Sequence, residues 1–322
     1  MLTNEWAIIF NLLSIVVTAL LVTTVLLCFA WLAIAQYIEQ FSLHMQKRIL
    51  WLFASAPWLL SVIYVTFFVP SLFQSHNTIW LTHWHHPHEF YLASWHGAFL
   101  FIFILGFAYI LIRKALTASR HLSVLNSLTG LFQKKDQCEQ LGFDVVVLES
   151  QKPLAFSAGI FSPKCYVTSG LVEQLSDKEL DIILGHERAH IEHKDLQQKM
   201  LFSLLISLFP KPVSIQLNRL FSLVAEKLAD TAVSVNHSKL DIAQTLIKSA
   251  RAQKLFAENV GFKVVNYFIT DDVDSRVKAL IEPQEFRFFS WAYCLLVLAA
   301  LTVMSFAGVD GLHHLVETLF SH

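Results

Sequence analysis

The sequence predicts a mainly α-helical membrane protein that carries an α+β domain on one side of the bilayer. Three observations lead to this prediction: long runs of the chain carry no charge, the basic residues are confined to two stretches, and a polar segment of domain size interrupts the apolar runs. Hydrophobic residues make up 55% of the chain and charged residues only 15%, which is too apolar for a soluble domain of this length.

The uncharged runs are each long enough, or nearly so, to cross a bilayer as a helix. We expect four transmembrane helices, at about residues 6–36, 49–73, 95–112 and 288–309. So many apolar runs cannot all be core helices of one soluble domain. The first run is not expected to be a cleavable signal peptide, because it lacks a basic start and the first Lys or Arg is Lys47.

The basic residues predict the orientation of the chain. The first two, Lys47 and Arg48, follow the first apolar run, and all the others lie within residues 113–287. Loops rich in Lys and Arg stay on the cytoplasmic side of a membrane. We therefore expect the N-terminus, the loop at residues 74–94 and the C-terminal tail to lie outside, in a multi-pass protein of the inner (plasma) membrane.

The chain is thus expected to form three parts. Residues 1–112 hold three spans and an external loop, residues 113–287 form a cytoplasmic domain, and residues 288–322 hold the fourth span and a short external tail. No basic run indicates direct nucleic-acid binding. Because no CxxC pair occurs and the cytoplasm is reducing, we expect all of the cysteines to be free thiols. They are Cys28, Cys138, Cys165 and Cys294.

The most informative motif lies within the cytoplasmic segment, where His186-Glu187-Arg188-Ala189-His190 matches HExxH. Positions i and i+4 of a helix share a face, so both histidines can ligate one zinc ion. Glu187 then lies where a general base can activate water for peptide hydrolysis. A capping box, Ser176 followed three residues later by Glu179, precedes an apolar-periodic run and predicts that the motif is helical.

A single-zinc peptidase requires a third protein ligand and an open position for water. The best candidate is Glu226, which lies in a stretch that is helical by periodicity. Asp230 follows one turn later and can accept a hydrogen bond from a ligating imidazole. His193 is a rival ligand, because it lies roughly on the face of His186 and His190. Three ligands from one straight helix fit tetrahedral geometry poorly, however, which favours Glu226.

A small sheet is predicted ahead of the motif helix. Residues 143–148, 154–158 and 165–168 are typical of strands, and the last two are joined by a turn with Gly159 and Pro163. In zinc peptidases of this kind, an edge strand beside the metal holds the substrate extended by backbone pairing. The hairpin formed by the last two strands is our candidate for this role, and an ordinary packing sheet is the alternative.

Three stretches resemble the BlaR/MecR-type integral-membrane zinc metallopeptidases: Pro163–Val167, Gly185–Asp195 and Glu226–Asp230. The likeness covers roughly residues 95–285 and extends to the layout of three spans, a cytoplasmic zinc domain and a fourth span. Residues 274–280 also resemble the short Arg-bearing helix that follows the third ligand in these peptidases. HtpX-like membrane peptidases share HExxH and ExxxD but usually separate them by more residues and spans, so the short separation favours the BlaR/MecR type.

The resemblance implies a zincin-like domain of the gluzincin type, with His186, His190 and Glu226 as zinc ligands and Glu187 as the base. Characterised members of the family transmit an external signal and cleave a cytoplasmic transcriptional repressor. They also carry an external penicillin-binding sensor domain after the fourth span, whereas only a short tail follows here. We therefore do not expect β-lactam sensing.

The predicted external loop is unusually rich in histidine. Clustered imidazoles can bind zinc, copper or nickel, or titrate near neutral pH. A polar interfacial loop is the plainer interpretation. The candidate residues for an external metal or pH site are His83, His85, His86 and His88.

The leading interpretation is a membrane-embedded, zinc-dependent endopeptidase that cleaves a protein at the cytoplasmic face. The expected partners are the lipid bilayer and a protein substrate, for which a transcriptional repressor is one candidate. One alternative is a non-enzymatic membrane sensor of metal or pH with a structural zinc domain. Another is a quality-control peptidase for membrane proteins, which shares the same chemistry. The sequence assigns no oligomeric state.

Overall fold

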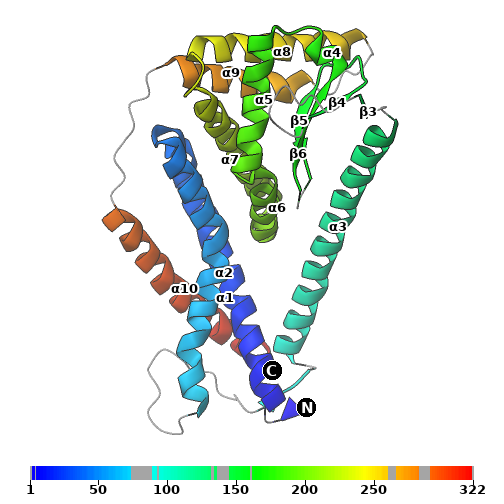
Figure 1. The fold of residues 1–322 in the computed structure, drawn as a ribbon. Coiled ribbons are helices and arrows are strands. Elements are labelled where there is room, and N and C mark those ends of the chain that lie inside the picture. Colours follow the sequence, from blue (N-terminus) through cyan, green and yellow to red (C-terminus); the bar gives the residue numbers. More distant parts are fainter. Residues whose placement is uncertain are drawn as a thin grey trace.

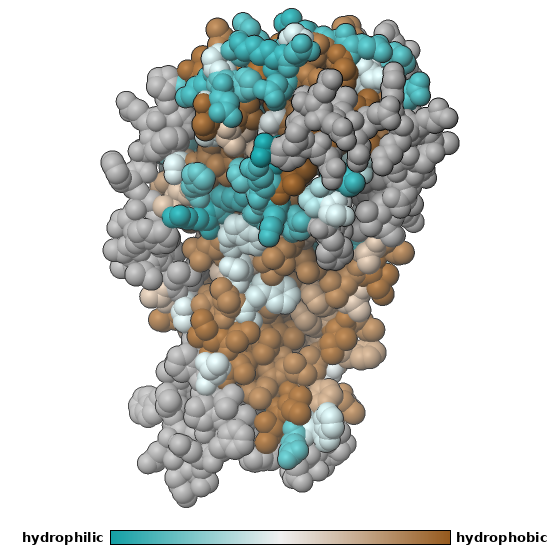
Figure 2. All heavy atoms as spheres, viewed as in Figure 1, coloured by the Kyte–Doolittle hydropathy of each residue, from teal (hydrophilic) through white to brown (hydrophobic). Residues whose placement is uncertain are grey.

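The protein is mainly helical and has an apolar end and a polar end. A computed structural model describes residues 2–3, 5–73, 89–92, 94–131, 134–135, 145–159, 162–259, 266–282 and 291–320. Long helices form one end, and shorter helices with a small sheet form the other (Figure 1). Hydrophobic residues dominate the visible surface of the long helices, and hydrophilic residues gather over the short ones (Figure 2).

The first three apolar runs form the helices predicted for them. Within the part of the chain that the structure describes, three helical stretches are long and apolar enough to cross a membrane: Glu5–Gln40, Leu43–Thr66 and Trp95–Thr117. The elements that contain them are α1 (Glu5–Ile34) with the 3-10 helix η1 (Ala35–Gln40), α2 (Leu43–Phe73) and α3 (Trp95–Leu131). Helix α3 continues without a break beyond the predicted span, so the third span and the polar stretch after it are one helix.

The fourth apolar run forms α10 (Trp291–Phe320), which packs against α1. The hydroxyl oxygens of Thr23 and Ser305 are hydrogen-bonded at 2.9 Å in this buried interface. Gly308 allows the close approach, because an added Cβ there would lie 2.9 Å from the side chain of Val22. The helix begins near the start of the predicted span and continues beyond its predicted end to Phe320, and its role as a fourth span stays a prediction.

The described ends of the chain lie together, away from the short helices (Figure 1). Strand β1 (Leu2–Thr3) pairs in antiparallel fashion with β2 (Glu89–Phe90), which follows the predicted external loop. The candidate external site itself lies outside the described residues, at His83, His85, His86 and His88.

A four-stranded sheet in the order β3-β4-β6-β5 precedes the motif helix. Strands β4 and β6 are parallel, the other two pairs are antiparallel, and β5 forms an edge. The hairpin turn needs Gly159, whose φ is 112° and whose added Cβ would meet the carbonyl of Ser162 at 2.6 Å. The strands are β3 (Lys134–Lys135), β4 (Val145–Leu148), β5 (Ala155–Ala158) and β6 (Lys164–Thr168). The three strands predicted from the sequence are therefore present.

Helix α5 carries the HExxH motif and begins at the predicted capping box. The backbone N–H of Ser176 donates to Glu179 Oε2 at 2.8 Å, and the Glu179 N–H donates to Ser176 Oγ at 3.4 Å. After β6 the helices are α4 (Ser169–Val172), α5 (Asp177–Glu192), α6 (Asp195–Leu205), η3 (Ile206–Leu208), α7 (Lys211–Val233), α8 (Lys239–Asn259) and α9 (Asn266–Ile281).

The connection between α5 and α6 is short, because α5 ends at Glu192 and α6 begins at Asp195. Lys194 adopts φ 54° and ψ 39°, the left-handed conformation that costs a residue other than glycine roughly 1–2 kcal/mol. This single residue lies between the C-terminal cap of α5, His193, and the first residue of α6, Asp195, whose carboxylate lies beside His190 of α5. The strained turn therefore positions a carboxylate next to the metal-binding motif.

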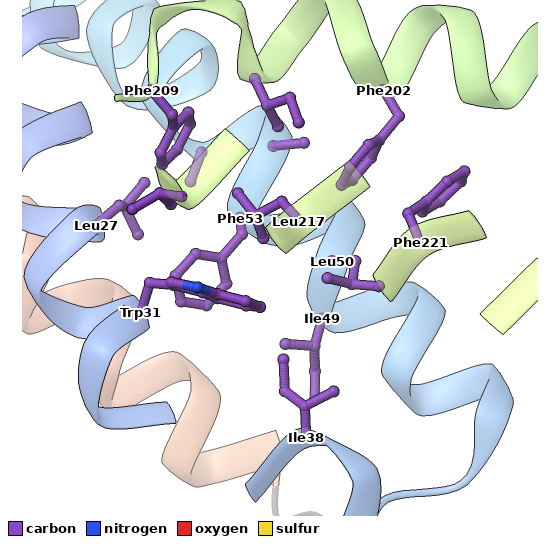
Figure 3. Packing of buried hydrophobic residues seen from close by; sticks show 14 of the residues in the cluster. Leu27, Trp31, Ile38, Ile49, Leu50, Phe53, Phe202, Phe209, Leu217 and Phe221 are labelled. Carbon is purple, nitrogen blue, oxygen red and sulfur yellow. The ribbon is translucent and has the colours of Figure 1, made fainter. Parts of the chain in front are cut away.

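The membrane helices and the short helices share one hydrophobic core. Buried side chains from α1, α2, α6 and α7 interlock in it (Figure 3). Phe202 stacks on Phe221 with ring centroids 4.2 Å apart, and Trp51 meets both rings edge-on. The labelled members of this shared core are Leu27, Trp31, Ile38, Ile49, Leu50, Phe53, Phe202, Phe209, Leu217 and Phe221.

Polar contacts hold the same two groups of helices together. The indole N–H of Trp58 on α2 donates to the carbonyl of Leu205 at 3.0 Å. Lys114 on α3 donates from Nζ to the carbonyl and the hydroxyl of Ser203, at 2.6 Å each. Helix α6 is therefore fixed by specific contacts to two of the candidate membrane spans.

Truncation of Phe202 should destabilise the whole protein, because its ring is fully buried in the shared core. We expect Phe202→Ala to cost about 3–5 kcal/mol of unfolding free energy. Thermal unfolding of the full chain in detergent, followed by tryptophan fluorescence, measures the effect. The matched control is Leu201→Ala on the same helix, where the side chain is half exposed and the change should stay within about 0.5 kcal/mol. Equal melting temperatures for both variants would contradict this account of the core.

Cys165 on β6 should be inert in the folded protein. Burial, reinforced by the negative charge of Glu187, raises the pKa of its thiol to about 12, so almost no thiolate exists near neutral pH. We expect iodoacetamide at pH 8 to leave Cys165 unmodified in the native protein and to alkylate it fully after denaturation, as read by peptide mass spectrometry. Rapid labelling of the native protein would show that β6 is not packed as described.

Candidate active site

The structure brings together the three side chains that the sequence predicted as metal ligands. Helix α5 presents His186 and His190 on one face, with their Nε2 atoms 3.0 Å apart. Helix α7 brings in Glu226, whose Oε2 lies 3.2 Å from Nε2 of His186 and 3.4 Å from Nε2 of His190. Among the described residues, these three form a group whose donor atoms could hold one metal ion.

The spacing of the three donor atoms fits zinc. Donors that lie 2.0–2.1 Å from a zinc ion at tetrahedral angles are about 3.3 Å apart from one another. The observed separations of 3.0, 3.2 and 3.4 Å cluster around that value. Two imidazole nitrogens and one carboxylate oxygen are also a donor set that zinc peptidases use. The residues present therefore fit this ion.

Each imidazole is oriented by a buried carboxylate on its far side. His186 Nδ1 lies 2.9 Å from Asp230 Oδ1, and His190 Nδ1 lies 2.8 Å from Asp195 Oδ2. A carboxylate at Nδ1 keeps the proton there, which leaves the lone pair of Nε2 directed at the shared centre. Asp230 occupies the position that its spacing from Glu226 predicted. The corresponding role of Asp195 was not predicted.

Arg276 of α9 contacts two of the carboxylates at the predicted metal centre, those of Asp230 and Glu226. Its Nε donates to Asp230 Oδ2 at 2.8 Å and its Nη2 donates to Oδ1 at 2.7 Å, a two-point contact that fixes the carboxylate. Its Nη1 lies 3.4 Å from Glu226 Oε2, and Lys199 of α6 lies 3.3 Å from Glu226 Oε1. Two cations thus hold the predicted third ligand in place.

The electrostatics of the cluster favour ionised carboxylates. Burial raises the pKa of Glu226, but hydrogen bonds from His186 and His190 outweigh it and hold that pKa well below its usual value. The pKa of Asp230 is likewise lowered, since the contacts with Arg276 and His186 overcome the effect of burial. For Asp195, the hydrogen bond from His190 outweighs burial and lowers the pKa.

The same contacts make the imidazoles more basic. Burial lowers the pKa of His190, but hydrogen bonds to Asp195 and Glu226 raise it overall to about 9. The pKa of His186 is also raised, because Asp230 and Glu226 more than offset its burial. Without a cation, His190 therefore carries protons on both ring nitrogens at neutral pH. A metal ion must displace the Nε2 proton of His190, so its affinity should fall as the pH falls.

Glu187, the predicted base, borders the same space as two of the predicted metal ligands. Together with His186, Glu226 and Arg276, it lines a pocket of about 200 Å³. Ala155 of the edge strand β5 lines the same pocket, so the sheet edge and the predicted metal centre face one space. The apolar wall of the pocket comes from α5, α7 and α8. Its members are Ile182, Ile183, Val233, Ile242 and Leu246.

His193, the rival third ligand, is not part of this group. It is the C-terminal cap of α5, where the helix has already ended, and the chain then turns at Lys194. Asp195 joins the site only because of that turn, and no local pattern in the sequence indicates its contact with His190. The place of Arg276 at the site could have been predicted, since this residue lies in the segment that resembles the Arg-bearing helix of BlaR/MecR-type peptidases.

Two comparisons with known proteins find relatives of this chain. The family model described as Peptidase family M48 matches residues 115–282, more than half of the chain. A protease HtpX homolog from Thermodesulfovibrio yellowstonii (strain ATCC 51303 / DSM 11347 / YP87) is 44% identical over 55 residues, which are 16% of this chain and 19% of that protein. The chain thus aligns with about a fifth of the length of this curated relative.

The two matches add to the observation of three helices that are long and apolar enough to cross a membrane. They support a membrane protease, and a zinc metallopeptidase is consistent with them. They do not confirm the narrower resemblance to BlaR/MecR-type peptidases. From the extent of the family match, the chain belongs to peptidase family M48.

Proposed function

We propose that the protein is a membrane-embedded zinc endopeptidase that hydrolyses a protein substrate at the cytoplasmic face of the inner membrane. The observation that carries the proposal is the meeting of His186, His190 and Glu226 in the pocket that Glu187 lines. The two imidazoles and the Glu226 carboxylate would hold the metal, and the Glu187 carboxylate would accept and donate protons during hydrolysis.

His186, His190 and Glu226 would bind zinc, which supplies Lewis-acid polarisation of the scissile carbonyl when it is bound. The Glu187 carboxylate accepts a proton from the attacking water and returns it to the leaving amine nitrogen. Asp230 holds the Nδ1 proton of His186, which keeps that ring in the tautomer that ligates through Nε2.

Strand β5 supports an extended mode of substrate binding. It is an edge of the sheet, and its first residue, Ala155, lines the pocket. A substrate that pairs with this edge would place its scissile bond beside Glu187. One of its side chains would then enter the pocket along the apolar wall, which favours an apolar residue there.

The distribution of charge supports the proposed orientation. The described ends of the chain lie at the end of the molecule away from α8 and α9 (Figure 1). All the Lys and Arg residues lie at Lys47 and Arg48 or within residues 113–287. Because basic segments are retained in the cytoplasm, this distribution favours an orientation with the peptidase helices inside and both ends of the chain outside.

A peptidase is favoured over a non-enzymatic sensor with a structural zinc domain. Structural zinc sites commonly use four protein ligands, whereas catalytic sites keep one position for water or substrate. Among the described residues, three protein donors meet at the centre, and a carboxylate suited to act as a base lines the same pocket. A site with a pocket and a base is suited to catalysis.

Substitution of Glu187 should separate catalysis from metal binding. We expect Glu187→Gln to lower kcat by at least about 100-fold, because the amide cannot accept the proton of water. Zinc content, measured by mass spectrometry of the purified protein, should stay at the wild-type level. The matched control is Glu192→Gln, an exposed position on the same helix. Cleavage by Glu187→Gln at the wild-type rate would refute the mechanism.

The same variant identifies the substrate class. Comparison of the proteome of cells that carry Glu187→Gln with that of wild-type cells shows which proteins accumulate uncleaved. Accumulation of one regulatory protein would support cleavage of a repressor, and accumulation of many membrane proteins would support quality control.

Removal of either orienting carboxylate should weaken metal binding. We expect Asp230→Asn and Asp195→Asn each to lower zinc affinity by about 10- to 100-fold, because each loses the charged partner of a ligating imidazole. Competition with a chromophoric chelator, performed on the full chain in detergent, measures the dissociation constant. Asp181→Asn, at an exposed position on α5, is the matched control and should bind zinc as the wild type does. If all three variants bound zinc equally, the two carboxylates would have no role in holding the metal.

A further inference from the structure

A lysine of a candidate membrane span contacts a carboxylate beside the predicted metal centre. Lys47 is on α2, and its Nζ lies 3.3 Å from Asp195 Oδ1. The other oxygen of the same carboxylate, Oδ2, lies 2.8 Å from His190 Nδ1. The lysine side chain is 18% exposed and that of Asp195 only 3%, so the contact is well shielded from water. One carboxylate therefore joins α2 to a predicted ligand.

A second contact holds the lysine in this position. Its Nζ lies 5.9 Å from the centroid of the Phe221 ring, within the range of a cation–π interaction. Phe221 belongs to α7, the helix that carries Glu226, and it stacks on Phe202 of α6. Lys47 thus touches both helices that complete the site, while its neighbours Ile49 and Leu50 anchor α2 in the shared core.

We propose that Lys47 is a positioning residue, through which helix α2 sets the orientation of His190. This inference rests on the proposed zinc peptidase function. The ammonium group fixes Asp195 Oδ1, and so holds Oδ2 in line with the imidazole. Without it, the carboxylate can rotate about its side-chain bonds, and the direction of the His190 Nε2 lone pair is less well defined.

Through this contact, the ability of the site to hold its metal ion depends on the position of helix α2. A shift of α2 relative to α6 that opened the contact between Lys47 and Asp195 would loosen His190 without touching the metal or the substrate. An event that moves the α1–α2 pair within the bilayer can therefore change how firmly the peptidase holds its ion.

The test compares two adjacent basic residues in the full chain. Lys47→Met keeps an apolar stem over Phe221 but removes the charge, and Arg48→Met removes the same charge from an exposed neighbour. Removal of a direct partner of a ligating imidazole costs about 10- to 100-fold in metal affinity. Because Lys47 acts one step farther away, we expect Lys47→Met to lower zinc affinity by about 3- to 10-fold, while Arg48→Met leaves it unchanged. Lys47→Arg should restore the affinity.

A double-substitution experiment shows whether Lys47 acts through Asp195. In an Asp195→Asn background, Lys47→Met should cause no further loss of zinc affinity, because the carboxylate that it positions is already gone. At a limiting zinc concentration, Lys47→Met should lower kcat and leave KM unchanged. Melting temperatures report any general loss of structure. Lys47→Gln, which is shorter and uncharged, replaces Lys47→Met if the latter does not fold.

Two results would overturn the inference. One is equal zinc affinity in Lys47→Met and Arg48→Met, and the other is an equal effect of Lys47→Met with and without Asp195→Asn. In either case the proposed function survives if the wild-type chain binds zinc and its cleavage depends on Glu187. If the wild-type chain itself bound no zinc, the proposed function would fail first.

Discussion

The predicted metal centre depends on two hydrogen bonds between a buried carboxylate and an imidazole. Asp230 and Asp195 engage the Nδ1 atoms of His186 and His190, and this forces both Nε2 atoms toward one point. Glu226 then supplies the third donor at a distance that suits zinc. Without the outer carboxylates the rings could flip or change tautomer, and the shared face of the helix would not suffice to define a site.

The two carboxylates are themselves held by cations from different parts of the chain. Arg276 of α9 fixes Asp230, and Lys47 of α2 contacts Asp195. One side of the centre therefore depends on the last helix of the peptidase segment, and the other side depends on a candidate membrane span. The fold of the whole chain is needed to complete a site whose predicted ligands come from only two helices.

The sequence predicted the features that depend on local spacing. Helical periodicity places His186 and His190 on one face, a capping box marks the start of α5, and Asp230 follows Glu226 by one turn. Features that depend on tertiary contacts were not predictable. Asp195 reaches His190 only through the left-handed residue Lys194.

The shared core limits how the protein can be divided. Phe202, Leu217 and Phe221 of the peptidase helices are covered by side chains of α1 and α2. A fragment expressed without the first two helices would expose these rings and methyl groups to water and so would be prone to aggregate. Biochemical work on this peptidase therefore calls for the intact chain in detergent or lipid. A fragment that held only the peptidase helices would lack the part of its hydrophobic core that α1 and α2 supply.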